Sequence, residues 1–314
     1  MLFKMHYALK DYGANLNWSV GSLFCHDETL FNILELCMRF SIDHPIKWAF
    51  GCIPSLMASG MAVSKIHSVK TAITMMEQYI ERGIACRLAL SNPHADLKMI
   101  ENDTINQELM KFLNSNGLEK SRHGVVLTSD VLAEYVREAY PNLDVVLSVI
   151  RPAYEVGYGM MNDTLEWYAK KLENALYDYV GVNNAKLHED GFMESLPLKE
   201  KVELIACRNC MRNCPYTKHH FEAALGVNSF LYSSKDVEKS KIILNEVNHM
   251  CIETRRKHLD QASSYTMEDM TKLASLGYRN FQISARMNLD CRFERDVEEY
   301  LFVYKHLRYL QNLM

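Results

Sequence analysis

The segment 123–150 reads HGVVLTSDVLAEYVREAYPNLDVVLSVI and contains one complete strand–helix–strand pattern. An apolar run at 123–128 is followed by Ser129 and Asp130, residue types that favour a helix N-cap. The stretch 131–139 has helical periodicity, and a second apolar run follows at 145–150. This order predicts a βαβ unit with two parallel, buried strands.

The same pattern recurs along most of the chain. Apolar runs that we interpret as strands lie at 46–53, 84–90, 123–128, 145–150, 179–182, 202–206, within 257–265, and at 280–284. Helix-patterned stretches follow them at 64–82, 104–113, 131–139, 163–175, 193–198, 215–225, 266–276 and 295–313. Eight strand–helix repeats predict a (β/α)8 barrel of the TIM type.

An open doubly wound sheet is the main alternative fold. Its first turn is typically glycine-rich, whereas residues 54–62 read PSLMASGMA. The chain also has no Pro/Gly/Ser-rich linker that would mark a domain boundary. We therefore expect a single α/β barrel domain over residues 1–314, with extra loops and with residues 1–45 as an N-terminal extension before the first strand.

Composition narrows the class of protein. A chain of 314 residues that is 48% hydrophobic can bury a large core, and nine cysteines, an odd number, favour a reducing compartment over a disulfide framework. No segment approaches the roughly 20 apolar residues of a membrane span, and the first residues lack the order of a signal peptide. We expect a soluble, cytoplasmic protein without a membrane partner.

Three closely spaced cysteines carry the strongest chemical signal. The segment 202–224, VELIACRNCMRNCPYTKHHFEAA, places Cys207, Cys210 and Cys214 at C-x2-C-x3-C directly after an apolar run. This spacing lets thiolates bind one metal ion or cluster, and it matches the latter part of the bacterial ferredoxin run. Because the run is the sixth predicted strand, the loop 207–220 should lie at the mouth of the barrel, where barrel active sites form.

The cysteines predict a cofactor but leave its identity open. A [4Fe–4S] iron–sulfur cluster is our first prediction and a zinc ion is the alternative. Cys251 and His220 are equal candidates for the fourth ligand. The order C-x2-C-x3-C is the reverse of the radical-SAM spacing, so that class is not predicted. Cys37, Cys52 and Cys86 lie in apolar patterns and should only pack.

Polar residues at strand ends are candidates for substrate binding and catalysis. Arg151 and Arg286 follow predicted strands, where a guanidinium can bind phosphate or carboxylate through two hydrogen bonds. Asn183 also ends a strand, where its amide suits either substrate binding or a turn. A loop salt bridge is the competing interpretation for both arginines. Asp130 fits a helix cap better than a catalytic role.

The chain resembles the collagenase-like peptidase family. The resemblance rests on residues 268–286, EDMTKLASLGYRNFQISAR, and on Cys210-Met-Arg-Asn-Cys214, which is similar to one cysteine pair of that family. The family's cysteines are more widely spread than the three in this chain. The resemblance implies a barrel fold and, from several members, iron–sulfur-dependent hydroxylation of RNA or quinone rather than peptide cleavage.

Three functions follow as hypotheses. The first is a metal- or iron–sulfur-dependent barrel enzyme that acts on a small molecule or RNA. The basic run 253–258, ETRRKH, is compatible with RNA or DNA phosphates, although a single run of this kind is usually a solvated helix face. The second is a non-catalytic binding protein in which zinc staples the cysteine loop. The third is a peptidase with Cys214 as nucleophile, ranked last because no His–Asp partner set is visible.

Overall fold

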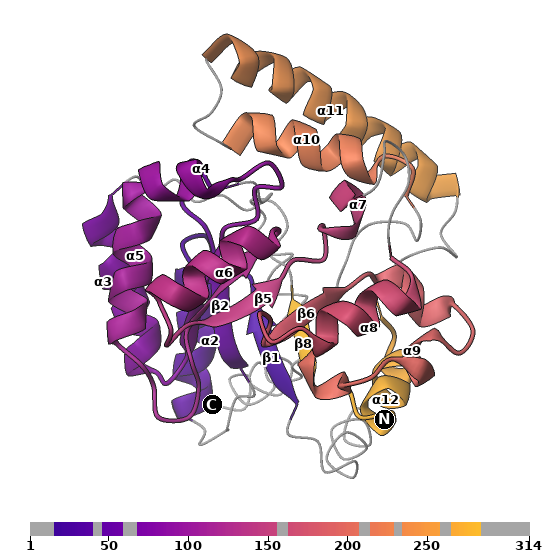
Figure 1. Ribbon diagram of the computed structural model, residues 1–314, viewed down its shortest axis with the longest axis horizontal. Coiled ribbons are helices and arrows are strands. Elements are labelled where there is room, and N and C mark those ends of the chain that lie inside the picture. The colour runs from indigo at the N-terminus through magenta and orange to yellow at the C-terminus, as the bar shows by residue number, and fades with distance from the viewer. Residues whose placement is uncertain are drawn as a thin grey trace.

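The computed structural model describes residues 16–39, 46–58, 68–155, 163–206, 214–228, 234–257 and 265–283 (Figure 1). Its centre is a closed barrel of eight parallel strands in sequence order, which confirms the predicted (β/α)8 fold. The strands are β1 (Asn17–Val20), β2 (Ile46–Gly51), β3 (Ala85–Ala89), β4 (Gly124–Leu127), β5 (Asp144–Leu147), β6 (Tyr179–Val182), β7 (Val202–Ile205) and β8 (Asn280–Ile283).

Helices connect the strands and cover the outside of the barrel (Figure 1). The longer ones are α2 (Asp27–Arg39), α3 (Val69–Glu81), α5 (Thr104–Ser115), α6 (Asp130–Ala139), α8 (Leu165–Glu173) and α12 (Met267–Ser275). Shorter turns of helix are α4 (Leu97–Asn102), α7 (Pro152–Glu155), α9 (Phe192–Ser195), η1 (Asn184–His188) and η2 (Lys199–Lys201). After β7 come α10 (Thr217–Asn228) and the long α11 (Ser234–Lys257), which lie side by side.

The barrel begins earlier in the chain than the apolar runs indicate. β1 lies within residues 1–45 and closes the barrel by pairing with β8, with Asn17 opposite Asn280. The prediction that the first strand starts at Ile46 was therefore wrong, and the cysteine loop follows the seventh strand rather than the sixth. β1 reads NWSV, so its two inward-facing residues are polar and it gives no apolar run.

The predicted strand within 257–265 was also wrong. Lys257 is the last residue of α11, residues 258–264 lie outside the described residues, and the barrel closes without a strand there. The stretch is apolar only in short pieces, which cannot distinguish a strand from a helix end.

Outward-facing strand residues form the main core with the helices. Most of them are apolar and buried, as with Val125 and Leu127 on β4 and Val180 and Val182 on β6. Cys52 and Cys86 are buried as predicted, whereas the side chain of Cys37 lies outside the described residues. No helix in the described part of the chain is long and apolar enough to cross a membrane.

Inward-facing residues follow from the strand register, because paired residues of parallel strands share a face. Arg87 on β3 reaches Glu203 on β7, the strand four places away around the ring, so both point into the barrel. Alternate strands then supply layers of four residues each, as in other barrels. From the amino-terminal end, the layers are Trp48, Gly124, Tyr179 and Asn280; Ser19, Arg87, Val146 and Glu203; and Phe50, Val126, Gly181 and Gln282.

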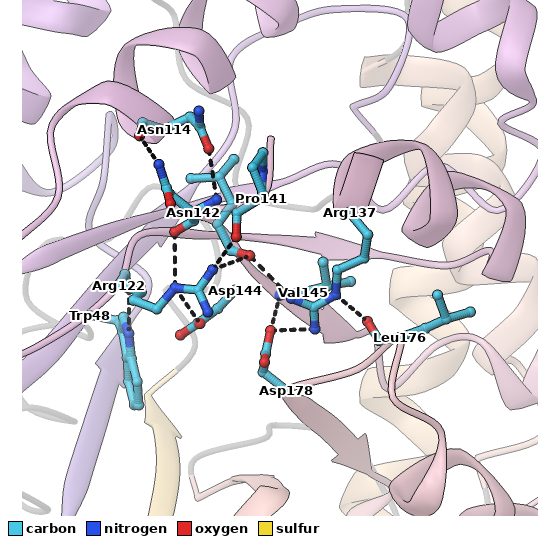
Figure 2. A network of polar contacts seen from close by, with 11 residues as sticks. Trp48, Asn114, Arg122, Arg137, Pro141, Asn142, Asp144, Val145, Leu176 and Asp178 are labelled. Carbon is cyan, nitrogen blue, oxygen red and sulfur yellow. Dashed lines mark hydrogen bonds and ion pairs between the residues drawn. The ribbon is translucent and has the colours of Figure 1, made fainter. Parts of the chain in front are cut away.

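A network of charged residues joins the loops at the amino-terminal end of the barrel (Figure 2). Arg122 lies 3.5 Å from Asp144 and donates to three carbonyls of the loop before β5, while Arg137 donates to Asp178 at 2.7 Å. Trp48 Nε1 donates to the carbonyl of Arg122. Burial and the nearby Asp178 raise the pKa of Asp144 to about 6. The network lies opposite the mouth and holds the loops before β4, β5 and β6 together.

Candidate active site at the mouth of the barrel

The loops that follow β3, β5, β6 and β7 carry the candidate functional residues. In a barrel these loops share the carboxyl-terminal face, where active sites form. The structure places four of the predicted site residues on or beside these loops: Arg151 after β5, Asn183 after β6, and Cys214 and His220 after β7. Cys207, Cys210 and Arg286 lie outside the described residues.

Cys214 and Cys251 come together from different elements. Cys214 precedes α10, and its carbonyl accepts hydrogen bonds from the backbone and hydroxyl of Thr217. Cys251 lies on α11, and its Sγ is 4.0 Å from that of Cys214. Both side chains are partly exposed. The structure thus pairs the last cysteine of the C-x2-C-x3-C motif with one of the two predicted fourth ligands.

His220, the other predicted fourth ligand, lies on α10, six residues after Cys214 in the sequence. Its backbone N–H donates to the carbonyl of Tyr216. Among the described residues no group of three or more His, Cys, Asp or Glu side chains is placed to hold a metal ion. Cys214, Cys251 and His220 therefore do not form a three-ligand site by themselves.

α10 is attached to the loops after β3 and β5 by a cluster of four side chains. His94 Nε2 lies 3.1 Å from both carboxylate oxygens of Glu222. The His94 ring stands edge-on to Tyr154 at 5.6 Å, and Lys218 Nζ lies 5.4 Å from the centre of the same Tyr154 ring. The contacts place α10, and Cys214 before it, at the mouth of the barrel.

Arg151 belongs to an ion-pair network between α6, α7 and α8. Its Nε donates to Glu155 at 2.8 Å, and Lys171 binds both oxygens of Asp130 at 2.8 Å. Burial alone would raise the pKa of Glu155, but hydrogen bonds from Trp167 and Arg151 outweigh it and lower the pKa. Within the described residues no hydrogen bond from either Nη group of Arg151 is found, so that end of the guanidinium is available to a ligand.

Asn183 has a structural role. From the sequence, this role and substrate binding were equally compatible with its position at the end of a strand. Its amide nitrogen donates to Asp163 at 3.2 Å, and its amide oxygen accepts from the backbone of Ala185 at 3.3 Å, which caps η1. A role in substrate binding stays a prediction. Asp130 lies in the first turn of α6 and pairs with Lys171 and Tyr177, while Ser129 occupies the N-cap position without a side-chain cap.

Comparison with known proteins gives little beyond the fold. No family model and no curated protein matches the chain. Among solved structures, the chain matches that of the U32 peptidase Mk0906 at 10% identity and a TM-score of 0.44, over 87% of this chain and 93% of that chain. At this identity and TM-score the match establishes neither a shared family nor a shared activity.

Several site residues were not identified from the sequence. Glu222 and Lys218 lie in an ordinary helical pattern and Tyr154 lies between a predicted strand and a predicted helix, so only the fold brings them to His94. Arg87 and Glu203 did leave a signal, because each is a charged residue in the middle of an apolar strand, IACRLAL and VELIA. A charge at such a position is rarely buried unless it is paired, which predicts a partner inside the barrel.

Proposed function

We propose that this chain is a metal-dependent barrel enzyme whose metal centre is held by Cys207, Cys210, Cys214 and Cys251 at the mouth of the barrel. The observation that carries the proposal is the 4.0 Å separation of the Cys214 and Cys251 sulfur atoms. The two residues are 37 positions apart in the sequence, so the approach depends on the packing of α11 against α10. Within the proposal the protein is cytoplasmic, and its substrate is a small molecule or RNA.

The donor set fits a thiolate-bound metal. Two thiolates on one tetrahedral zinc ion, with Zn–S bonds of about 2.3 Å, lie about 3.8 Å apart. Four cysteines could also hold an iron–sulfur cluster, which would supply electron transfer or a Lewis-acid iron when bound. We propose the cluster as the primary form on the C-x2-C-x3-C spacing, whereas the 4.0 Å separation of the Cys214 and Cys251 sulfur atoms matches two thiolates on one metal ion.

The chain's own residues supply substrate binding and proton transfer next to this centre. Arg151, held by Glu155, directs its Nη groups to an anionic substrate group. The Glu222 carboxylate orients the imidazole of His94, an arrangement suited to general acid–base catalysis. Lys218 and Tyr154 hold α10 in position for both roles.

A zinc-stapled binding protein is the second candidate, because the 4.0 Å separation matches a single tetrahedral ion. Cleavage of peptides by Cys214 has less support, since its thiol lies 4.0 Å from that of Cys251 and no His–Asp partner set is visible in the sequence.

Metal analysis of the full chain, purified without oxygen, tests these proposals. The enzyme proposal expects iron and acid-labile sulfide with visible absorption near about 400 nm. A colourless protein with one zinc ion per chain would instead support the binding protein whose cysteine loop is held by zinc. Metal-free protein, together with a folded Cys207/Cys210/Cys214→Ser variant of unchanged stability, would overturn both.

A further inference from the structure

Cys214 and Cys251 are placed to react with each other as well as to bind a metal. Their Sγ atoms lie 4.0 Å apart, and the S–S bond of a disulfide is about 2.05 Å long. The two sulfur atoms therefore have to approach by only about 2 Å to form a bond. Cys214 lies in the turn before α10 and Cys251 lies on α11, and these two helices pack against each other, so the fold itself keeps the two thiols close.

Among the cysteines whose side chains the structure describes, these two are the most accessible to an oxidant in a reactive form. Oxidation needs a thiolate that the oxidant can reach. Cys214 and Cys251 are partly exposed. Cys52 and Cys86 are buried, and burial raises the pKa of the Cys25 thiol to about 12. We therefore expect an oxidant to react with Cys214 and Cys251 before the other three.

We propose that hydrogen peroxide joins Cys214 and Cys251 in a reversible disulfide, so that the pair is a redox modification site. One thiolate attacks a peroxide oxygen, the O–O bond breaks, and a sulfenic acid forms with release of hydroxide. The second thiolate attacks the sulfenic sulfur, which forms the S–S bond and releases a second hydroxide. The two thiol protons convert both hydroxides to water, so the thiols lose two electrons and the peroxide gains them. A dithiol reverses the step by exchange.

The disulfide and the metal centre exclude each other. A sulfur atom in a disulfide is no longer a thiolate, so oxidation removes two of the four ligands assigned to the centre. This consequence rests on the proposed function, because Cys214 and Cys251 are ligands only within it. Peroxide thus prevents metal binding at the mouth of the barrel, and a thiol reductant restores it. The formation of the disulfide itself requires no metal.

Peptide mapping of the full chain tests the disulfide. Trypsin cleaves after Arg208 and Arg212, which places the three clustered cysteines in separate peptides. We expect the metal-free chain, treated with a slight excess of hydrogen peroxide and then alkylated, to yield peptide 213–218 linked to peptide 242–255 as its main disulfide product. Dithiothreitol added before alkylation should remove the link. Mass spectrometry measures the linked and alkylated peptides in the same digest.

Zinc loading tests the competition with the metal centre. Zinc binding by the untreated, metal-free chain is measured first. The zinc-loaded chain should then give the linked peptides in at least about tenfold lower yield, because metal-bound thiolates are withheld from peroxide. The oxidised chain should bind zinc only after reduction. An untreated chain that binds no zinc would contradict the metal centre, whereas the link is measured without metal, so the two failures are distinguishable.

Two variants serve as controls. Cys251→Ala should give no link from Cys214, while Cys52→Ala changes a buried cysteine outside the pair and should give the link in full. The proposal is overturned if no link between the two peptides forms in the metal-free chain, or if Cys214 is linked to Cys207 or Cys210 instead. A yield that bound zinc leaves unchanged would overturn the competition.

Discussion

At the scale of single residues, Arg87 and Glu203 show that a buried charge can be interpreted only together with its partner. Each interrupts an apolar strand, and the sequence gives no sign that the two meet 116 positions apart. Only the order of the strands around the ring places β3 opposite β7. Burial of outward-facing residues such as Cys86 was predictable, because strand periodicity is local, whereas this pairing is not.

The pair predicts an unequal response to single and double substitution. Arg87→Met leaves Glu203 buried without its partner and should lower the free energy of unfolding by about 3–5 kcal/mol. Arg87→Met/Glu203→Met removes both charges and should lose much less than the sum of the two single variants. Urea unfolding measures both. Additive losses would contradict a direct ion pair inside the barrel.

Asp144 makes stability depend on pH in a defined window. Its pKa is raised to about 6 in the folded protein, from an ordinary value near 3.8, chiefly by burial. The folded state therefore holds the proton more tightly than the unfolded state, and the stabilisation by protonated Asp144, complete below about pH 4, is lost as the pH rises through 6.

Asp144→Asn should remove this loss. The variant should be more stable than the parent chain by about 1–3 kcal/mol at pH 8 and by much less at pH 4, measured by urea unfolding at both pH values. A variant that is destabilised equally at both would show that the ion pair with Arg122, at 3.5 Å, outweighs the burial of the charge.

At the scale of elements, strands with a clear apolar run were predicted correctly, and strands without one were missed. The runs at 84–90, 123–128 and 179–182 became β3, β4 and β6 with small shifts at their ends. β1 was missed because its inward residues, Asn17 and Ser19, are polar. Cys251 was identified as a ligand candidate from its residue type alone, and its approach to Cys214 required α11 to pack on α10.

The start of α12 gives a direct test of element stability. Thr266 and Asp269 form a reciprocal capping box, in which the Thr266 side chain accepts from the Asp269 backbone and the Asp269 side chain accepts from the Thr266 backbone. Thr266→Ala should cost about 1 kcal/mol, whereas Thr266→Ser should cost almost nothing. Equal unfolding curves for the two variants would contradict the cap.

At the scale of the whole molecule, the charged network and the candidate site lie at opposite ends of the barrel. The amino-terminal end carries the Arg122–Asp144 and Arg137–Asp178 contacts, which join loops to one another (Figure 2). The opposite end carries α10, α11 and the loops with Cys214 and His94 (Figure 1). The overall fold was predictable because repeated strand–helix units admit few arrangements, while the contents of the mouth depend on long loops with weak local patterns.

The metal content of Cys251→Ala, compared with that of Cys52→Ala, tests the central claim most directly. Cys251 lies 4.0 Å from Cys214, whereas Cys52 is buried and has no place in the proposed ligand set. We predict that Cys251→Ala, purified without oxygen, loses most of the metal bound by the parent chain and that Cys52→Ala retains it. Equal metal content in the two variants, or no metal in the parent chain, would contradict a metal centre at the mouth of the barrel.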